Sequence, residues 1–126
     1  MKGYVDDIEK ATLENTNFRK VLYTGKYAQL VVMNLGPGED IGEEIHEDVD
    51  QFFRIEEGEA KVIIDGEARE VGDDWAIVVP AGAKHNVINI GEGELKLYTI
   101  YSPPNHPDGT VHKDKAEADE YEKSHH

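Results

Sequence analysis

Short runs of β-forming residues, separated by glycine, limit the possible folds of this chain more than any other feature. Runs such as YAQLVVMNL, EAKVIIDG and ELKLYTIYS follow one another between Arg19 and Ser102. The glycines between the runs are Gly25, Gly36, Gly38, Gly58, Gly66, Gly72, Gly82 and Gly91. Many short strands with glycine turns at near-regular spacing are typical of a β-sandwich or barrel. We therefore predict an all-β fold that forms one domain.

Local patterns within this region predict turns and faces. Three segments have the composition of tight hairpin turns, namely Glu57-Gly58, Asp65-Gly66 and Gly91 to Glu94. Side chains alternate between the two faces of a strand, so one face of the last strand carries Leu95, Leu97, Thr99 and Tyr101. The aromatic residues expected in the core are Phe52, Phe53, Trp75 and Tyr98.

The two ends of the chain differ from this β-rich centre. Residues 1–18 are expected to form an N-terminal arm, either a short helix or an irregular segment, because Val5, Ile8 and Ala11 follow a helical spacing. Residues 19–112 are expected to form the barrel and its closing loop. Residues 113–126 form a charged tail that is expected to be flexible, frayed or weakly helical. The last two residues, His125 and His126, are left out of the functional argument, since they are either native or part of an affinity tag.

A proline-rich segment leaves the last predicted strand. Pro103, Pro104 and Pro107 cannot continue a strand, because proline lacks the backbone N–H that a β-ladder needs. Two interpretations are open for this loop. It folds over the open end of the barrel, where Tyr101, His106 and His112 help to form a site, or it is a surface connector with incidental histidines.

Charge and cysteine content narrow the possible functions. The 126 residues include 27 acidic and 13 basic side chains, which give a net charge of −14. Such a surface repels phosphate backbones and anionic lipids, so we expect no nucleic-acid or membrane partner. The chain has no cysteine, which excludes disulfides, thiolate metal sites and cysteine nucleophiles. Its N-terminus lacks an apolar leader, and we expect a cytoplasmic protein with a small-molecule substrate.

Four polar residues are candidates for a metal site. Glu44 and His46 are one residue apart, so they share a face if they lie on a strand. Gln51 follows on the expected return strand, and His85 stands just after the turn formed by residues 80–82. Imidazole and carboxylate groups suit zinc, manganese, iron, nickel or copper, and the residue types do not select among them. The same residues could instead be a solvated glutamate, a core amide and two structural histidines.

The region from Gly72 to Asn89, GDDWAIVVPAGAKHNVIN, closely resembles the second motif of the cupin superfamily. The match lies in the spacing of Gly72, Pro80, Gly82, His85 and Asn89. The region 42–58, GEEIHEDVDQFFRIEEG, resembles an altered first motif, with Glu44, His46 and Gln51 at the three ligand positions. The resemblance extends over residues 28–101. It implies a small single-domain cupin with a double-stranded β-helix, or jelly-roll barrel.

The resemblance also implies a function. Glu44, His46, Gln51 and His85 would bind a divalent metal in an enzyme that acts on a small polar substrate. One glutamine, one glutamate and two histidines are also the zinc ligands of type I phosphomannose isomerases, although the glutamine and glutamate are exchanged here. Two histidines and one carboxylate are instead similar to the set of cupin dioxygenases. The alternative is a non-catalytic module that binds a sugar or another small molecule. Because many small cupins are homodimers and several strands carry apolar residues on both faces, we expect a homodimer.

Overall fold

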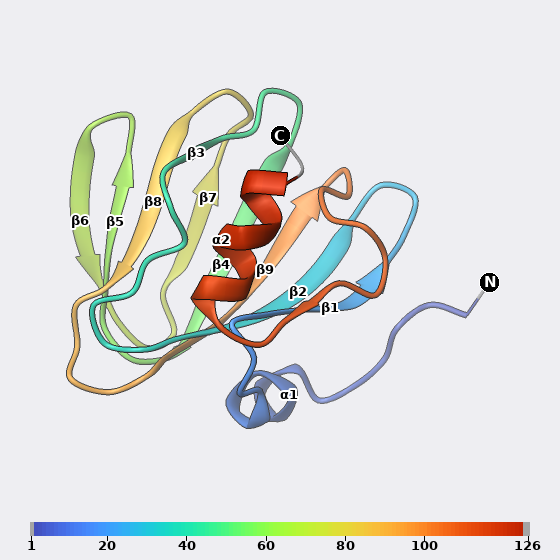
Figure 1. Cartoon of the computed structure of the whole chain (residues 1–126), viewed down its shortest axis with the longest axis horizontal. Helices are drawn as coiled ribbons and strands as arrows, with labels where there is room; N and C mark the ends of the chain where they lie inside the picture. Colours follow the sequence, from blue (N-terminus) through green and yellow to red (C-terminus); the bar gives the residue numbers. More distant parts are fainter. Residues whose placement is uncertain (1, 125–126) are drawn as a thin grey trace.

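The computed structural model describes residues 2–124 and shows two antiparallel β-sheets packed face to face (Figure 1). The helices are α1 (Ile8–Glu14) and α2 (Lys115–Ser124). The strands are β1 (Arg19–Thr24), β2 (Gln29–Leu35), β3 (Glu44–Ile45), β4 (Asp50–Glu57), β5 (Ala60–Ile64), β6 (Glu67–Val71), β7 (Ala76–Val79), β8 (Lys84–Asn89), β9 (Leu95–Ser102) and β10 (Val111–His112). The predicted all-β jelly-roll fold with a short N-terminal helix is confirmed.

The connections between the two sheets explain which predicted hairpins form. One sheet has the strand order β10-β1-β2-β9-β4-β7, and the other has the order β3-β8-β5-β6. Asp65 and Gly66 join β5 to β6 with positive φ angles of 48° and 85°, as predicted for a tight hairpin. The hairpins predicted at Glu57-Gly58 and at Gly91 to Glu94 are wrong. Both segments carry the chain from one sheet to the other, because closing a two-layer fold requires crossovers that short-range turn signals do not distinguish from hairpins.

Alternation along the central strands divides the interior into an apolar part and a polar end. Leu95 and Leu97 of β9 are fully buried and pack in the core, as predicted from the pattern. Further along the same inward face lie Thr99 and Tyr101, which are also buried. On β4, Gln51 pairs with Tyr101 in the strand register. The polar end of the interior, where β4 and β8 begin and β9 ends, is called the mouth of the barrel below.

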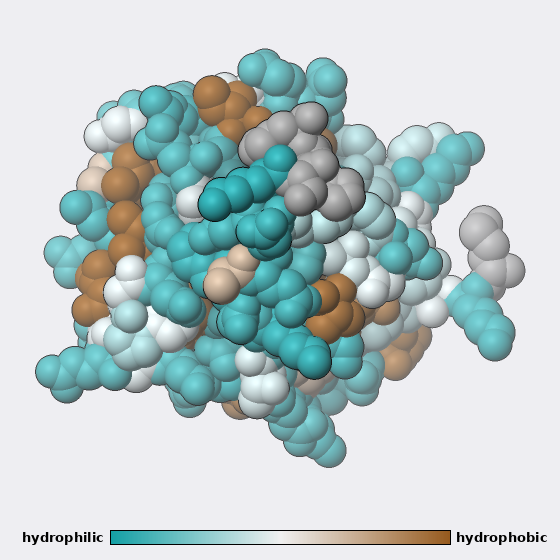
Figure 2. Space-filling model, in the orientation of Figure 1, coloured by the Kyte–Doolittle hydropathy of each residue, from teal (hydrophilic) through white to brown (hydrophobic). Residues whose placement is uncertain are grey.

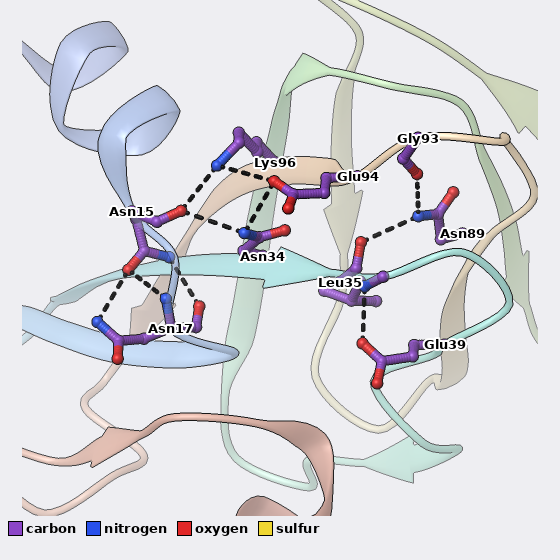
Figure 3. Close-up of polar contacts among 10 residues, drawn as sticks. Asn15, Asn17, Asn34, Leu35, Glu39, Asn89, Gly93, Glu94 and Lys96 are labelled. Carbon is purple, nitrogen blue, oxygen red and sulfur yellow. Dashed lines mark hydrogen bonds and ion pairs between the residues drawn. The ribbon is translucent and has the colours of Figure 1, made fainter.

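At the opposite end, an asparagine from the second motif fastens the crossover between β8 and β9 (Figure 3). The side-chain amide of Asn89 donates to the carbonyl oxygens of Leu35 and Gly93 at 3.0 and 2.9 Å, and its Oδ1 accepts from the backbone N–H of Gly91 at 2.9 Å. A buried amide that meets three backbone groups fixes the loop and leaves few polar atoms unsatisfied. Asn89 is therefore a structural member of the motif.

Both terminal segments are held against the sheets. The Nζ of Lys96, on β9, donates to the carbonyl oxygen of Asn15 just after α1 at 2.8 Å (Figure 3). The tail expected to be frayed forms helix α2, whose Ala118 is buried. Lys115 fixes the start of α2 through an ion pair with Asp40 at 3.1 Å. Composition could not predict this packing, because the helix has few apolar residues and is held by the buried Ala118, the Lys115 ion pair and the ring contact of Tyr121 with His112. His125 and His126 lie outside the described residues, and no described helix has the length and apolar character needed to cross a membrane.

The proline-rich loop packs against the barrel. The Oε1 of Gln29, a fully buried residue on β2, accepts hydrogen bonds from the backbone N–H groups of Asn105 and His106 at 3.1 and 2.9 Å. Its Nε2 donates to the carbonyl oxygen of His106 at 2.8 Å. One buried amide thus holds the loop against the sheet, which favours the interpretation of the loop as part of the barrel mouth over that of a surface connector with incidental histidines.

Of the aromatic residues expected in the core, only Phe53 is fully buried. Phe52 and Tyr98 lie half-buried on the outer face of the six-stranded sheet, with ring centroids 6.2 Å apart. Trp75 is 45% exposed and lies beside the guanidinium of Arg69. The prediction for Trp75 is wrong because this residue stands in the turn before edge strand β7, where a second layer does not cover it.

Gly58 provides a test of the fold. Its φ is +114°, and an added Cβ would lie 2.9 Å from the carbonyl oxygen of Glu94 and 3.1 Å from Cα of Leu95. We expect Gly58→Ala to lower the free energy of unfolding by about 2–4 kcal/mol, because strain and backbone overlap add. Gly93→Ala is the matched control, since a Cβ there meets no described atom within 4 Å. Urea unfolding of both variants checks this. Equal stabilities of the two variants would contradict the close contact between Gly58 and the backbone of Glu94 and Leu95.

Candidate metal centre

The pairing of β3 with β8 brings three of the predicted ligands together. Glu44 lies directly opposite His85 in this antiparallel register. His46 follows Glu44 by two residues, so its side chain points to the same side. The backbone N–H of Gly82 donates to the carbonyl oxygen of His46 at 2.8 Å, which fixes the end of β3 against the turn before β8. Gly82 has φ of +87°, a left-handed conformation that favours glycine.

The ligand atoms of these residues face one another. Each of Glu44, His46 and His85 contributes one possible ligand atom, and these three atoms lie within 4.8 Å of one another. Nε2 of His46 lies 2.6 Å from Oε2 of Glu44. Within the described residues these two atoms are in close contact but are not aligned for a hydrogen bond.

His85 is oriented as a metal ligand would be. Its side chain is buried, and Nδ1 lies 3.2 Å from the carbonyl oxygen of Ala83. Since a carbonyl oxygen only accepts, the proton must be on Nδ1, and Nε2 then carries a free lone pair. This buried Nε2 has no hydrogen-bond partner among the described residues. A histidine whose far nitrogen binds a backbone carbonyl is the usual arrangement around protein-bound metals, so the residues fit a divalent ion.

Gln51 enters the mouth from the other sheet. Its side chain is buried, its Nε2 donates to Oγ1 of Thr99 at 3.0 Å, and its Oε1 has no partner among the described residues. Gln51 also contacts the hydroxyl of Tyr101, whose ring packs edge-on against His46 at 5.8 Å between centroids. Gln51 is thus connected to His46 through Tyr101, and its free amide oxygen agrees with a weak fourth ligand or with an acceptor that orients a bound water.

Two further groups behind the predicted ligands contribute to the site. The hydroxyl of Tyr101 lies 3.2 Å from Nε2 of His106, and burial raises the pKa of Tyr101, which keeps the hydroxyl protonated. The guanidinium of Arg19 is buried, with one nitrogen 3.1 Å from Nδ1 of His112. Sequence patterns singled out Tyr101, His106 and His112 around the loop. They missed Arg19, because a charged residue at the start of a predicted strand is ordinarily assigned to the surface.

His106 is held in its neutral form. Burial, followed by the positive charge of Arg19, lowers the pKa of His106 to about 3. At neutral pH its ring therefore offers Tyr101 one donor or one acceptor nitrogen, according to the tautomer. His106, from the loop, and Tyr101 form an uncharged hydrogen-bonded pair. This pair lies beside the cluster of Glu44, His46 and His85.

A cavity of about 600 Å³ opens beside this cluster, and two members of the cluster, Glu44 and His46, line it. One wall is the segment 41–46, which includes Glu44 and His46. The second wall is the loop segment 105–107, and the third is α2 with Asp119, Tyr121 and Glu122. The volume suits a small organic ligand. The tail, which the sequence analysis left out of the site, therefore forms part of it.

The neutral state of His106 predicts a pH dependence of stability for the metal-free protein. The unfolded chain binds a proton at His106 below its ordinary value of 6.5, whereas the folded protein does so only near 3. Stability should therefore fall as the pH drops through this window. We expect His106→Asn to lose less stability than the unmodified chain between about pH 7 and about pH 4.5. Urea unfolding at both pH values measures this, and parallel losses would show that His106 is not buried in its neutral form.

Comparison with known proteins connects this geometry to a family. The model of the cupin domain (Cupin_2) matches residues 31–101. The protein YrkC of Bacillus subtilis (strain 168) is 55% identical over 123 residues, which cover 93% of this chain and 66% of YrkC. A protein of Acanthamoeba polyphaga mimivirus is 43% identical over 113 residues, which cover 86% of this chain and 70% of that protein. The chain thus spans about two thirds of the length of these relatives.

A solved structure shows the same fold at higher coverage. The crystal structure of BH2720 from Bacillus halodurans superposes with a TM-score of 0.93 at 47% identity, and the match covers 94% of this chain and 95% of that one. The family match extends over more than half of the 126 residues and includes Glu44, His46, Gln51 and His85. The protein is therefore a member of the cupin family.

Proposed function

We propose that this cupin binds a divalent metal through Glu44, His46 and His85 and acts as an enzyme on a small polar substrate. The observation that carries the proposal is a cluster in which ligand atoms of Glu44, His46 and His85 lie within 4.8 Å of one another, while the buried Nε2 of His85 has no hydrogen-bond partner among the described residues. Leaving such an atom unsatisfied costs about 1–3 kcal/mol, and a cation is the partner that suits both imidazoles and the carboxylate.

The chain's own residues have distinct parts in this proposal. When bound, the metal would polarise a substrate oxygen or activate a water or oxygen molecule. Gln51 would complete or orient the ligand sphere with its free Oε1. Tyr101 and His106 would hold a proton beside the substrate, since the hydroxyl and the neutral imidazole are joined at 3.2 Å. The loop and α2 limit the access of water to the cavity.

The ligand set supports oxygenase-type chemistry more than isomerisation. Two histidines and one carboxylate that leave further positions open form the set used by non-haem iron oxygenases. Gln51 is on the other sheet and is also engaged with Thr99, which makes it the weakest member of a four-ligand set. The alternative of a non-catalytic binding module would not need an unpartnered imidazole nitrogen at the mouth, and metal content separates the two.

Metal content is the first test of the proposal. Protein purified without metal-affinity resin should contain close to one equivalent of metal by elemental analysis. We expect His46→Gln and His85→Gln to lose the metal, because each removes one of two imidazole ligands. Gln51→Ala should retain most of it, since a neutral amide adds little electrostatic attraction. His112→Gln, which removes an imidazole away from the cluster, is the matched control.

Two results of this experiment would overturn parts of the proposal. A metal-free protein that cannot be loaded with zinc, iron or manganese would contradict the metal site and favour the binding module. If Gln51→Ala lost metal as completely as His85→Gln, the amide would be a full ligand. The four-residue set similar to that of the isomerases would then be favoured.

We also propose that the protein is a homodimer that joins at strand β7. This strand is at one edge of the six-stranded sheet, and Val78 is 65% exposed there beside Trp75. Hydrophobic surface also gathers where β5 and β6 form the neighbouring edge (Figure 2). With a net charge of −14, two copies repel each other least where such a mostly apolar surface meets, on which Arg69 offsets the charge of Glu67.

Light scattering tests this assembly. At micromolar concentration the mass should be twice the 14.1 kDa of one chain. Val78→Lys should give monomers, because it places a charge in the proposed contact. Val111→Lys changes an exposed valine on the opposite edge strand and should leave the dimer intact. A monomeric unmodified chain would remove the proposal.

A further inference from the structure

The cavity beside the metal cluster has an unusual balance of charge. Four carboxylates line it, those of Glu43, Glu44, Asp119 and Glu122. Within the part of the chain that the structure describes, no lysine or arginine lines it. Ionised carboxylates only accept hydrogen bonds. A ligand in this cavity therefore meets hydrogen-bond acceptors on the wall formed by α2, called the outer wall below. The ligand needs donor groups to pair with these acceptors.

The carboxylates of the outer wall are held in place by helix α2. Lys115 fixes the first turn of this helix, since its Nζ lies 3.1 Å from Asp40 and over the ring of Phe18. Asp119 and Glu122 follow on the same helix and face the cavity with Tyr121 between them. The surface around α2 is almost entirely hydrophilic (Figure 2). The charge of the outer wall is thus a property of a packed helix.

Nearby cations do not offer a site for an anion. Nζ of Lys84 lies 3.0 Å from Glu43, and Nζ of Lys115 is shared between Asp40 and Asp119. His106, which lines the cavity, is neutral. Phosphate and carboxylate groups bind where arginine, lysine or a set of free N–H groups converges. The lining residues provide no such group.

An observation independent of the acidic wall marks this cavity as a ligand site. Glu44 and His46 line the cavity, and their ligand atoms lie within 4.8 Å of one of His85, whose buried Nε2 has no hydrogen-bond partner in the part of the chain that the structure describes. A substrate in the cavity would meet the metal centre at the wall formed by residues 41–46 and the α2 carboxylates at the opposite wall.

We infer that the cavity takes uncharged or cationic small molecules rich in hydroxyl or amine donors, and that it rejects phosphorylated and carboxylated ones. That the bound molecule is a substrate rests on the proposed function. Asp119 and Glu122 on α2 would be the residues that determine specificity. A sugar phosphate, the substrate type suggested by the likeness to isomerases, is thereby disfavoured.

Three piperidine nitroxides of matched size test this inference. They carry an ammonium, a hydroxyl or a carboxylate group, and each broadens the NMR signals of nearby amide protons. The amides of Asn105, His106 and Tyr121 report on the cavity. We expect the broadening there to follow the order ammonium, hydroxyl, carboxylate, with the first exceeding the last by at least about twofold at low salt. An equal or stronger effect of the carboxylate probe would overturn the inference.

Charge-neutralising variants locate the effect. Glu122→Gln combined with Asp119→Asn should reduce the ratio of ammonium to carboxylate broadening at the three cavity amides. Glu67→Gln removes the same kind of charge from β6, beside a different pocket, and should leave the ratio unchanged. If both changes lowered the ratio equally, the preference would belong to the net charge of the molecule, and the specificity role of α2 would be refuted.

The same measurements separate this inference from the proposed function. They are made on metal-free protein, where the full charge order is expected, and on protein incubated with zinc, where the positive charge of the ion should weaken the order without reversing it. A protein that takes up no zinc but keeps the order refutes the metal centre and supports the acceptor-lined cavity. A protein that binds zinc but favours the carboxylate probe keeps the metal centre and refutes the substrate class.

Discussion

The site depends on the register between β3 and β8. Two residues of β3 are enough to set Glu44 opposite His85, and the hydrogen bond from Gly82 to the carbonyl oxygen of His46 fixes the end of that strand. A shift of one residue would turn Glu44 and His46 away from the interior, because side chains alternate between faces. The glycine and proline of the preceding turn matter for the site because they set where β8 begins.

The same alternation gives the barrel a polar end at the expense of stability. At the mouth, the inward positions of β4, β9 and β8 hold Gln51, Tyr101 and His85. Deeper inward positions on the same strands hold Phe53, Leu97 and Val87. Among the residues that the structure describes, Oε1 of Gln51 and Nε2 of His85 have no hydrogen-bond partner, and neither has Nε of the buried Arg19. An apolar end would bury no unsatisfied polar atoms. The polar end therefore lowers the stability of the fold unless a ligand binds these atoms. Metal binding would then stabilise the fold as well as create the site.

The closure of the mouth relies on a few polar contacts made by segments of low hydrophobicity. Gln29 holds the proline-rich loop through three hydrogen bonds, and Lys115 holds α2 through an ion pair with Asp40. This ion pair is partly exposed, so it stabilises the contact only modestly. This part of the molecule therefore has the local stability expected of a wall that opens to admit a ligand, whereas the core strands form the rigid frame behind it.

The sequence by itself determined the fold class, the grouping of Leu95, Leu97, Thr99 and Tyr101 on one face of β9 and the candidate ligands Glu44, His46 and His85, because these follow from period-two alternation, turn residues and motif spacing. Only the tertiary structure decided which glycine segments cross between sheets, since a crossover and a hairpin use the same local residues. It also decided that Arg19 lies inside, that Trp75 lies outside and that the charged tail forms a wall of the cavity. These outcomes depend on which distant segment covers a residue, and neither composition nor local pattern contains that information.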